Sequence, residues 1–190
     1  MKRTVLIKNI KSKKGFSLLE LSWFLGFVVV FMIALFIIYP KVLTSQRSQA
    51  EINNIATIQT GVKALYTKTS SFTGLSDTVA VQKNIFPDNM LIGSGTAARP
   101  VNVFKGDVTL AVAATGPSKA PGSSFTITYF NVPAAECTKI ITAVAGNFYE
   151  VGVGEEAANV KAAGDVLDEA KTAIQCAAGG NSNTIIFTSI

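Results

Sequence analysis

Lys13-Lys14-Gly15-Phe16-Ser17-Leu18-Leu19-Glu20-Leu21 is the stretch that decides the fold, together with the apolar run that follows it. From Leu21 to Tyr39 there are 19 residues without a charge. That length predicts a helix that can span a bilayer. Glu20 stands at the head of this segment, where a carboxylate without a partner is costly. We therefore take Glu20 as a candidate functional residue.

The charge of the chain is unevenly distributed. The formal net charge is +5, but the first 15 residues hold six of the 17 basic residues and no acidic one. The remainder has 11 basic residues against 12 acidic ones, a net charge of −1. The positive-inside rule predicts that the basic leader stays in the cytoplasm. Because the remainder lacks a basic excess, we expect no nucleic acid partner.

The residue types argue against catalysis. The chain has no histidine, the commonest general base and metal ligand. Neither G-x-S-x-G nor S-x-x-K occurs, so no nucleophile is indicated. We expect no enzyme, no cofactor and no metal. One alternative is calcium binding by oxygen-rich acidic segments, although their spacing matches no EF-hand and helix capping explains them as well. The acidic residues concerned are Glu150, Glu155, Glu156, Asp165, Asp168 and Glu169.

Two cysteines, Cys137 and Cys176, lie far apart and form no CxxC motif. An even pair in an exported domain predicts a disulfide, whereas two buried thiols are the alternative. Closing a loop of about 40 residues stabilises a fold by about 4 kcal/mol in the chain-entropy model. Because both cysteines follow the apolar segment and would face an oxidising compartment, we expect the bridge.

Residues 16–68 are predicted to form one long helix. Residues 16–39 are its membrane part, and residues 40–68 are amphipathic. Ile52, Ile55 and Val62 recur at helical spacing there and predict one stripe for a globular core. Pro40 removes a helical hydrogen bond and predicts a kink, and Gly26 is a second weak point.

Residues 69–190 are predicted to form an α+β head. Period-two alternation predicts strands, including one at 101–104 that pairs with 108–112 across a tight turn. Further strands are expected at 125–130 and 184–188, and helices at 76–83, 134–148 and 166–177. We expect Asp165 to cap the last helix, with Leu167, Ala170 and Ile174 facing the core. Residues 150–164 carry no clear pattern.

The leader is not an ordinary secretory signal, in which cleavage follows the apolar core at small residues. Here the core is followed by Tyr39-Pro40-Lys41. An uncleaved signal anchor is one alternative, and it explains the apolar run but not Glu20.

The stretch resembles the N-terminus of type IV prepilins through Gly15, Phe16 and Glu20, with the basic leader before them. The resemblance implies that a prepilin peptidase removes residues 1–15 and methylates the amine of Phe16. It also implies that Glu20 neutralises the Phe16 amine of a neighbouring copy in a filament. In this family the helix between residues like Gly26 and Pro40 can loosen in the filament.

The family fold lays the first helix across an antiparallel sheet, with a disulfide-bracketed C-terminal segment at one edge. The long bracket from Cys137 to Cys176 and about 175 mature residues are similar to the type IVb group. One departure is Phe16, since that group often starts with another residue and has a longer leader.

The resemblance implies a major type IV pilus subunit, used for adhesion, aggregation or conjugative mating contact. The alternatives are a minor pilin, a type II secretion pseudopilin, or an uncleaved membrane-anchored binding domain. The implied partners are copies of itself, the peptidase, and an inner-membrane assembly platform with its ATPase. The precursor is expected in the inner membrane and the mature chain in an extracellular pilus.

Overall fold

The computed structural model describes residues 17–154 and 158–190, in backbone only at 37–44 and at Thr96. The chain forms two compact units, Met1–Val42 and Leu43–Ile190. The helices are α1 (Leu18–Leu65), α2 (Asp77–Gln82), α3 (Ala134–Val144) and α4 (Glu169–Ala178). The strands are β1 (Leu91–Ile92), β2 (Arg99–Pro100), β3 (Val108–Ala113), β4 (Ser124–Val132), β5 (Glu150–Val153), β6 (Ala158–Lys161) and β7 (Asn183–Ser189).

Helix α1 is assigned without interruption from Leu18 to Leu65, through both Gly26 and Pro40. It begins where the Ser17 carbonyl accepts hydrogen bonds from the following turn. At its C-terminal end the Thr67 hydroxyl donates to the Lys63 carbonyl at 2.8 Å, which satisfies one of the free carbonyls of the last turn. The bend predicted at Gly26 and Pro40 stays a prediction, as does the division of the chain after residue 68.

A five-stranded antiparallel sheet forms the centre of the head, in the order β3-β4-β7-β5-β6. Alternate residues of the adjacent strands β4 and β7 are fully buried, so one face of the sheet belongs to the core. Ile127 pairs with Phe187, and Tyr129 pairs with Ile185. The residues between them are only partly buried and lie on the opposite, outer face.

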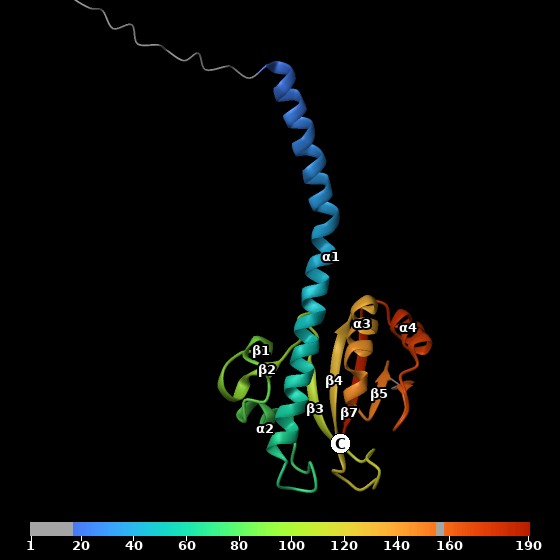
Figure 1. The fold of residues 1–190 in the computed structure, drawn as a ribbon. Helices are drawn as coiled ribbons and strands as arrows, with labels where there is room; N and C mark the ends of the chain where they lie inside the picture. The colour runs from blue at the N-terminus through green and yellow to red at the C-terminus, as the bar shows by residue number, and fades with distance from the viewer. Residues whose placement is uncertain (1–16, 155–157) are drawn as a thin grey trace, which may run out of the picture. The chain divides into compact units, whose positions relative to one another are not determined.

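Helices α1 and α3 contribute several residues each to the core of the head, and α2 and α4 contribute one each (Figure 1). The second half of α1 contributes Ile55, Ile58 and Val62, all without exposed surface. The predicted stripe of α1 is therefore confirmed at Ile55 and Val62, and Ile52 packs partly buried against the core. Helix α3 adds Ile140 and Ile141, which are also fully buried. The core thus joins a helix near the start of the chain to strands near its end.

Several predicted elements are confirmed near their expected bounds: the short helix α2 with Ser76 as its N-cap, strand β4, helix α3 and strand β7. The predicted long helix, antiparallel sheet and α+β class are also confirmed. Strands β5 and β6 lie within residues 150–164, where no clear pattern predicted an element.

The strand predicted at 101–104 is wrong. Only an isolated bridge joins Val101 to Asp107, and β3 pairs with β4 instead. Asn102 organises a loop here, because its Oδ1 accepts from the amides of Phe104 (2.9 Å) and Gly106 (3.0 Å). In a strand, the amides of Phe104 and Gly106 could bond a neighbouring strand, but here the Asn102 side chain binds both.

The start and rotation of the last helix also differ from the prediction. Asp168, not Asp165, caps α4, and its carboxylate accepts from the Lys171 amide at 2.8 Å. Ile174 is 66% exposed, and Ala170 is also exposed, whereas Thr172 and Cys176 are buried. Because Cys176 is tied to α3, the bond decides which face of α4 turns inward.

Candidate functional site

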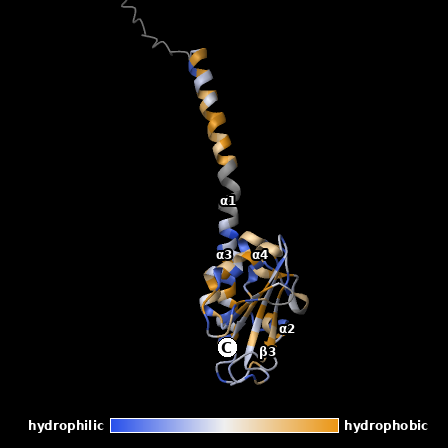
Figure 2. Cartoon of the chain, turned by 90° about the vertical axis from the view of Figure 1, so that its right-hand side faces the viewer, coloured by the Kyte–Doolittle hydropathy of each residue, from blue (hydrophilic) through white to orange (hydrophobic). Residues whose placement is uncertain are grey.

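The first half of α1 is an apolar helix that the chain itself leaves uncovered. Leu18–Phe36 comprises 19 residues and is long and apolar enough to cross a membrane (Figure 2). None of these residues is buried. Leu18 is 87% and Phe36 86% exposed. Exposed apolar surface on this scale requires a lipid or protein environment.

Glu20 lies in the first turn of this helix and is exposed. Its amide donates to the Ser17 carbonyl at 2.9 Å, and the Ser17 hydroxyl accepts from the Leu19 amide at 3.4 Å. A carboxylate in the first turn interacts favourably with the positive end of the helix dipole. Within residues 17–154 and 158–190 no cation pairs with Glu20. The geometry leaves its carboxylate open to a partner outside the chain.

The other assembly residues predicted from the sequence are placed as follows. Gly15 and Phe16, the predicted cleavage and methylation sites, lie outside the described residues. Gly26 faces open space, with no atom within 4 Å of a Cβ built on it. Pro40 lies within α1. The assigned roles of all four residues, and of Glu20, stay predictions.

The predicted disulfide is confirmed. Cys137 and Cys176 are bonded, with their Cα atoms 5.8 Å apart. Both side chains are fully buried. The bond joins α3 to α4 and therefore holds the C-terminal segment onto the core of the head.

Calcium binding by the acidic residues finds no support. Within the described ranges no group of three or more His, Cys, Asp or Glu side chains could hold a metal ion. Asp168 caps α4 instead, and Glu150 lies in β5. Glu155 and Glu156 lie outside the described residues.

Sequence reasoning missed a buried carboxyl group in the second half of α1. Glu51 has no exposed surface, and its Oε1 accepts a hydrogen bond from the Val103 amide at 2.7 Å. Asn54 donates to the other carboxyl oxygen at 3.3 Å. The signal was available, because Glu51 lies four residues before Ile55 and seven before Ile58, on the same helical stripe.

Glu51 and the loop after β2 hold each other in place. Burial raises the pKa of Glu51, and the hydrogen bonds from Val103 and Asn54 oppose this rise. The Tyr129 hydroxyl lies beside the same carboxyl, but at a geometry that does not complete a hydrogen bond. Burial and the nearby Glu51 charge raise the pKa of Tyr129. Further along α1, the Gln59 amide donates to the Asn147 carbonyl (2.8 Å) and to the Ser189 hydroxyl (2.9 Å).

The raised pKa of Glu51 predicts a pH-dependent stability of the head. A carboxyl group whose folded-state pKa exceeds its ordinary value of 4.5 stabilises the fold below that value. That contribution is lost as the pH rises through the folded-state pKa. We expect the free energy of unfolding to fall over this interval, and Glu51→Gln to reduce the fall. Denaturant unfolding of the full chain in micelles, followed by circular dichroism from pH 4 to 8, measures both curves.

This experiment needs a control for Asp77, because titration of a second carboxyl group with a raised pKa also changes the stability with pH. Burial also raises the pKa of Asp77, whose carboxylate accepts a hydrogen bond from the Leu110 amide. Asp77→Asn should therefore remove a separate part of the slope. A Glu51→Gln profile parallel to that of the wild type would contradict the role assigned to Glu51.

The fold is shared with solved pilin structures. A type IVb pilin from Salmonella typhi is 18% identical with a TM-score of 0.56, over 73% of this chain and 97% of that one. TcpA, a type IV pilin from the Vibrio cholerae El Tor biotype, is 13% identical with a TM-score of 0.52, over 76% and 99%. At these identities the likeness establishes the pilin fold.

The family follows from the sequence comparisons. The family model described as PilS N terminal matches residues 45–190. Two curated relatives, the major structural subunits of bundle-forming pilus from Escherichia coli O111:H- and O127:H6, are each 26% identical. Both alignments span 167 residues, 86% of this chain and 83% of the relative. The chain belongs to the PilS family and is a pilin subunit, a structural protein and not an enzyme.

Proposed function

We propose that this chain is the major subunit of a type IV pilus and polymerises through the first half of α1. The observation that carries the proposal is the bare apolar stretch Leu18–Phe36. A bilayer covers such a helix before assembly, and the same helices of other copies cover it afterwards. The relatives named as major structural subunits support the major role.

Glu20 determines how each copy aligns with its neighbour in the polymer. In a filament interior that excludes water, its carboxylate neutralises the amine of Phe16 on a neighbouring copy. That amine exists only after the leader has been removed, so unprocessed chains lack the partner. An opposite charge at close range is what makes two buried ions tolerable. Its open position in the first turn of α1 supports this docking role.

Maturation precedes assembly in this proposal. A prepilin peptidase cuts between Gly15 and Phe16 at the inner membrane and methylates the new amine. An assembly platform and its ATPase then move the subunit from the inner membrane into the extracellular filament. The helix between Gly26 and Pro40 bends or loosens as the copies pack. The filament serves adhesion, aggregation or mating contact.

Intact mass and N-terminal sequencing test the maturation step. The full chain is expressed with an active prepilin peptidase and, as the control, with a catalytically inactive one. We expect a chain that begins at methylated Phe16 only with the active enzyme. A chain still beginning at Met1 beside the active enzyme would instead identify an uncleaved membrane-anchored domain. Electron microscopy of sheared material then separates an abundant major subunit from a minor one.

A further inference from the structure

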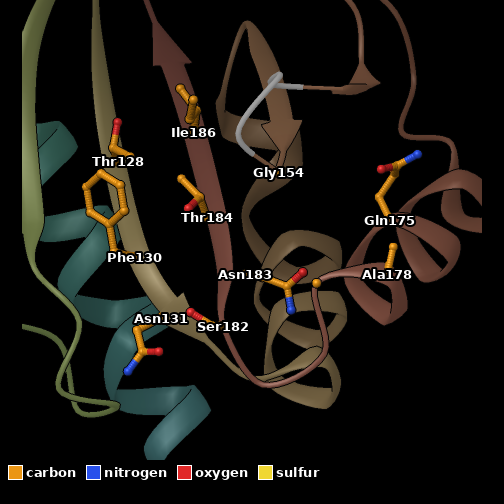
Figure 3. A pocket seen from close by; sticks show the side chains of 11 residues that line it. Thr128, Phe130, Asn131, Gly154, Gln175, Ala178, Ser182, Asn183, Thr184 and Ile186 are labelled. Atoms are coloured by element: carbon orange, nitrogen blue, oxygen red, sulfur yellow. The ribbon is translucent and has the colours of Figure 1, made fainter.

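The outer face of the sheet, opposite the face that belongs to the core, carries an open groove. Its volume is about 780 Å³, within the range of about 300–1,000 Å³ of small-ligand sites. Thr128 and Phe130 of β4 and Ile186 of β7 lie along its floor (Figure 3). Gln175 of α4 lies on its far side (Figure 3).

The groove follows from the way the sheet and α4 are joined. Thr128 and Ile186 are directly opposed in the register of β4 and β7, so both point to the outer face. Gln175 precedes Cys176, which the disulfide ties to α3. The covalent bond therefore fixes the wall of the groove relative to its floor.

A break in the sheet shapes one end of the groove. The register between β4 and β7 shifts between Tyr129 and Val132, and Asn131 there has a φ of 59°. Such bulges redirect side chains and recur beside binding sites. Here the bulge leaves the Phe130 ring 38% exposed at the groove. An aromatic ring left open in this way offers an apolar platform to a ligand.

Among the described residues, the lining of the groove combines apolar groups with uncharged polar groups and includes no charged side chain. Its hydroxyl and amide groups include Thr128, Gln175, Ser182 and Thr184. Within the described part of the chain, none of these four side chains makes a hydrogen bond to another residue. They remain available as directional donors and acceptors for a ligand.

A buried amide, Asn183, lies behind the lining of the groove. Asn183 is 1% exposed, and its Nδ2 donates to the carbonyls of Val132 (3.0 Å) and Gly180 (3.1 Å). Its Oδ1 has no partner within the described residues. That oxygen fills the place that a Cβ would take at Gly179, which also lines the groove. Because this oxygen is itself buried, it is not open to a ligand, and Asn183 contributes by fixing the backbone at the end of the groove.

The geometry points to a binding site for a neutral saccharide. A sugar ring presents hydroxyl groups that match the amides and hydroxyls of the lining. Its C–H face packs on an aromatic ring, which Phe130 provides. A phosphate or an acidic sugar would require a cation, and the described residues of the lining include none. The inference goes beyond polymerisation, because it stands whether or not the chain is the major subunit.

Binding is measured with the full chain in zwitterionic micelles, because detergents with sugar headgroups would compete. The probes are neutral oligosaccharides of galactose, glucose, mannose and N-acetylglucosamine, and the readout is saturation-transfer NMR. We expect saturable binding of at least one class, unchanged between low and high salt. Galactose- or mannose-based host glycans and glucose-based bacterial polysaccharides form separate arms, which distinguish the source of the ligand.

Variants test whether the groove is the site. Phe130→Ala should weaken binding at least about tenfold, a loss of about 1.4 kcal/mol. Phe130→Trp should retain binding, because it keeps the aromatic face. Val112→Ala is the matched control, since Val112 is 37% exposed on β3 and lies outside the groove. Gln175→Ala should also weaken binding, without altering the circular dichroism spectrum.

Three outcomes would overturn the inference. One is the absence of binding to every neutral class. Another is preferential, salt-dependent binding of sialylated sugars, and the third is equal effects of Phe130→Ala and Val112→Ala. Electron microscopy separates this result from the proposed function, because Phe130→Ala chains should still form pili. Failure of the wild-type chain to form pili would contradict the pilus proposal alone.

Discussion

Glu20→Ala is expected to leave leader removal intact and to abolish filaments. Without this carboxylate, the Phe16 amine of a neighbouring copy enters a water-free interior unpaired, which costs several kcal/mol. The cost recurs at every subunit, so it acts on the whole polymer. The variant is more apolar at the head of α1, so membrane insertion should not suffer. Electron microscopy of sheared material measures filaments, and N-terminal sequencing measures processing.

Two further variants distinguish the loss of the Glu20 charge from a change in side-chain shape. Glu20→Gln keeps the size of the side chain and removes its charge, so it should fail as Glu20→Ala does. Ser22→Ala is the matched control, because Ser22 lies in the same stretch and, among the described residues, its hydroxyl donates only to the Leu19 carbonyl, at 2.9 Å. Ser22→Ala should assemble normally. Normal filaments from Glu20→Ala would refute the docking role.

Removing the disulfide is expected to have the largest effect on stability. The bond joins residues separated by 39 positions, and the chain-entropy model gives about 4 kcal/mol for such a loop. We expect the double variant Cys137→Ala with Cys176→Ala to lose about this much free energy of unfolding. Alanine leaves no reactive thiol and adds no polar group to two fully buried positions.

Two measurements identify the bond as the cause. Denaturant unfolding of the full chain in micelles compares the double variant with wild-type protein under reducing and oxidising conditions. Reduced wild-type protein should match the double variant. Hydrogen exchange should show the loss first in α4, which the bond ties to α3. A loss below about 1 kcal/mol would mean that packing alone holds the C-terminal segment.

Much of the fold could be predicted because its signals are local. The apolar run after Glu20, the helical recurrence of Ile55 and Val62, and the alternation in β4 each reflect one element. The disulfide was predictable because the chain contains two cysteines and hence one possible intramolecular pair. The assembly residues came from a short motif at fixed spacing.

Two predictions, the strand at 101–104 and the inward face of the last helix, were wrong because side chains outside the local pattern decide the structure there. Residues 101–104 alternate as a strand does, but Asn102 and Glu51 take amides that a strand would need. The spacing of Ala170 and Ile174 predicts an inward face, but the bond at Cys176 turns α4 the other way. Asn102 acts within its own loop, whereas Glu51 lies 52 positions from Val103 and Cys137 lies 39 positions from Cys176.

The sequence by itself determined the apolar helix, its single carboxylate, the cysteine pair and the α+β class. Only the tertiary structure decided that Glu51 is buried and that Phe130 and Gln175 line one groove. The physical reason is the separation along the chain of the residues that interact. Periodicity and motif spacing record what one segment needs, whereas burial and grooves depend on which distant segments the sheet register and the disulfide bring together.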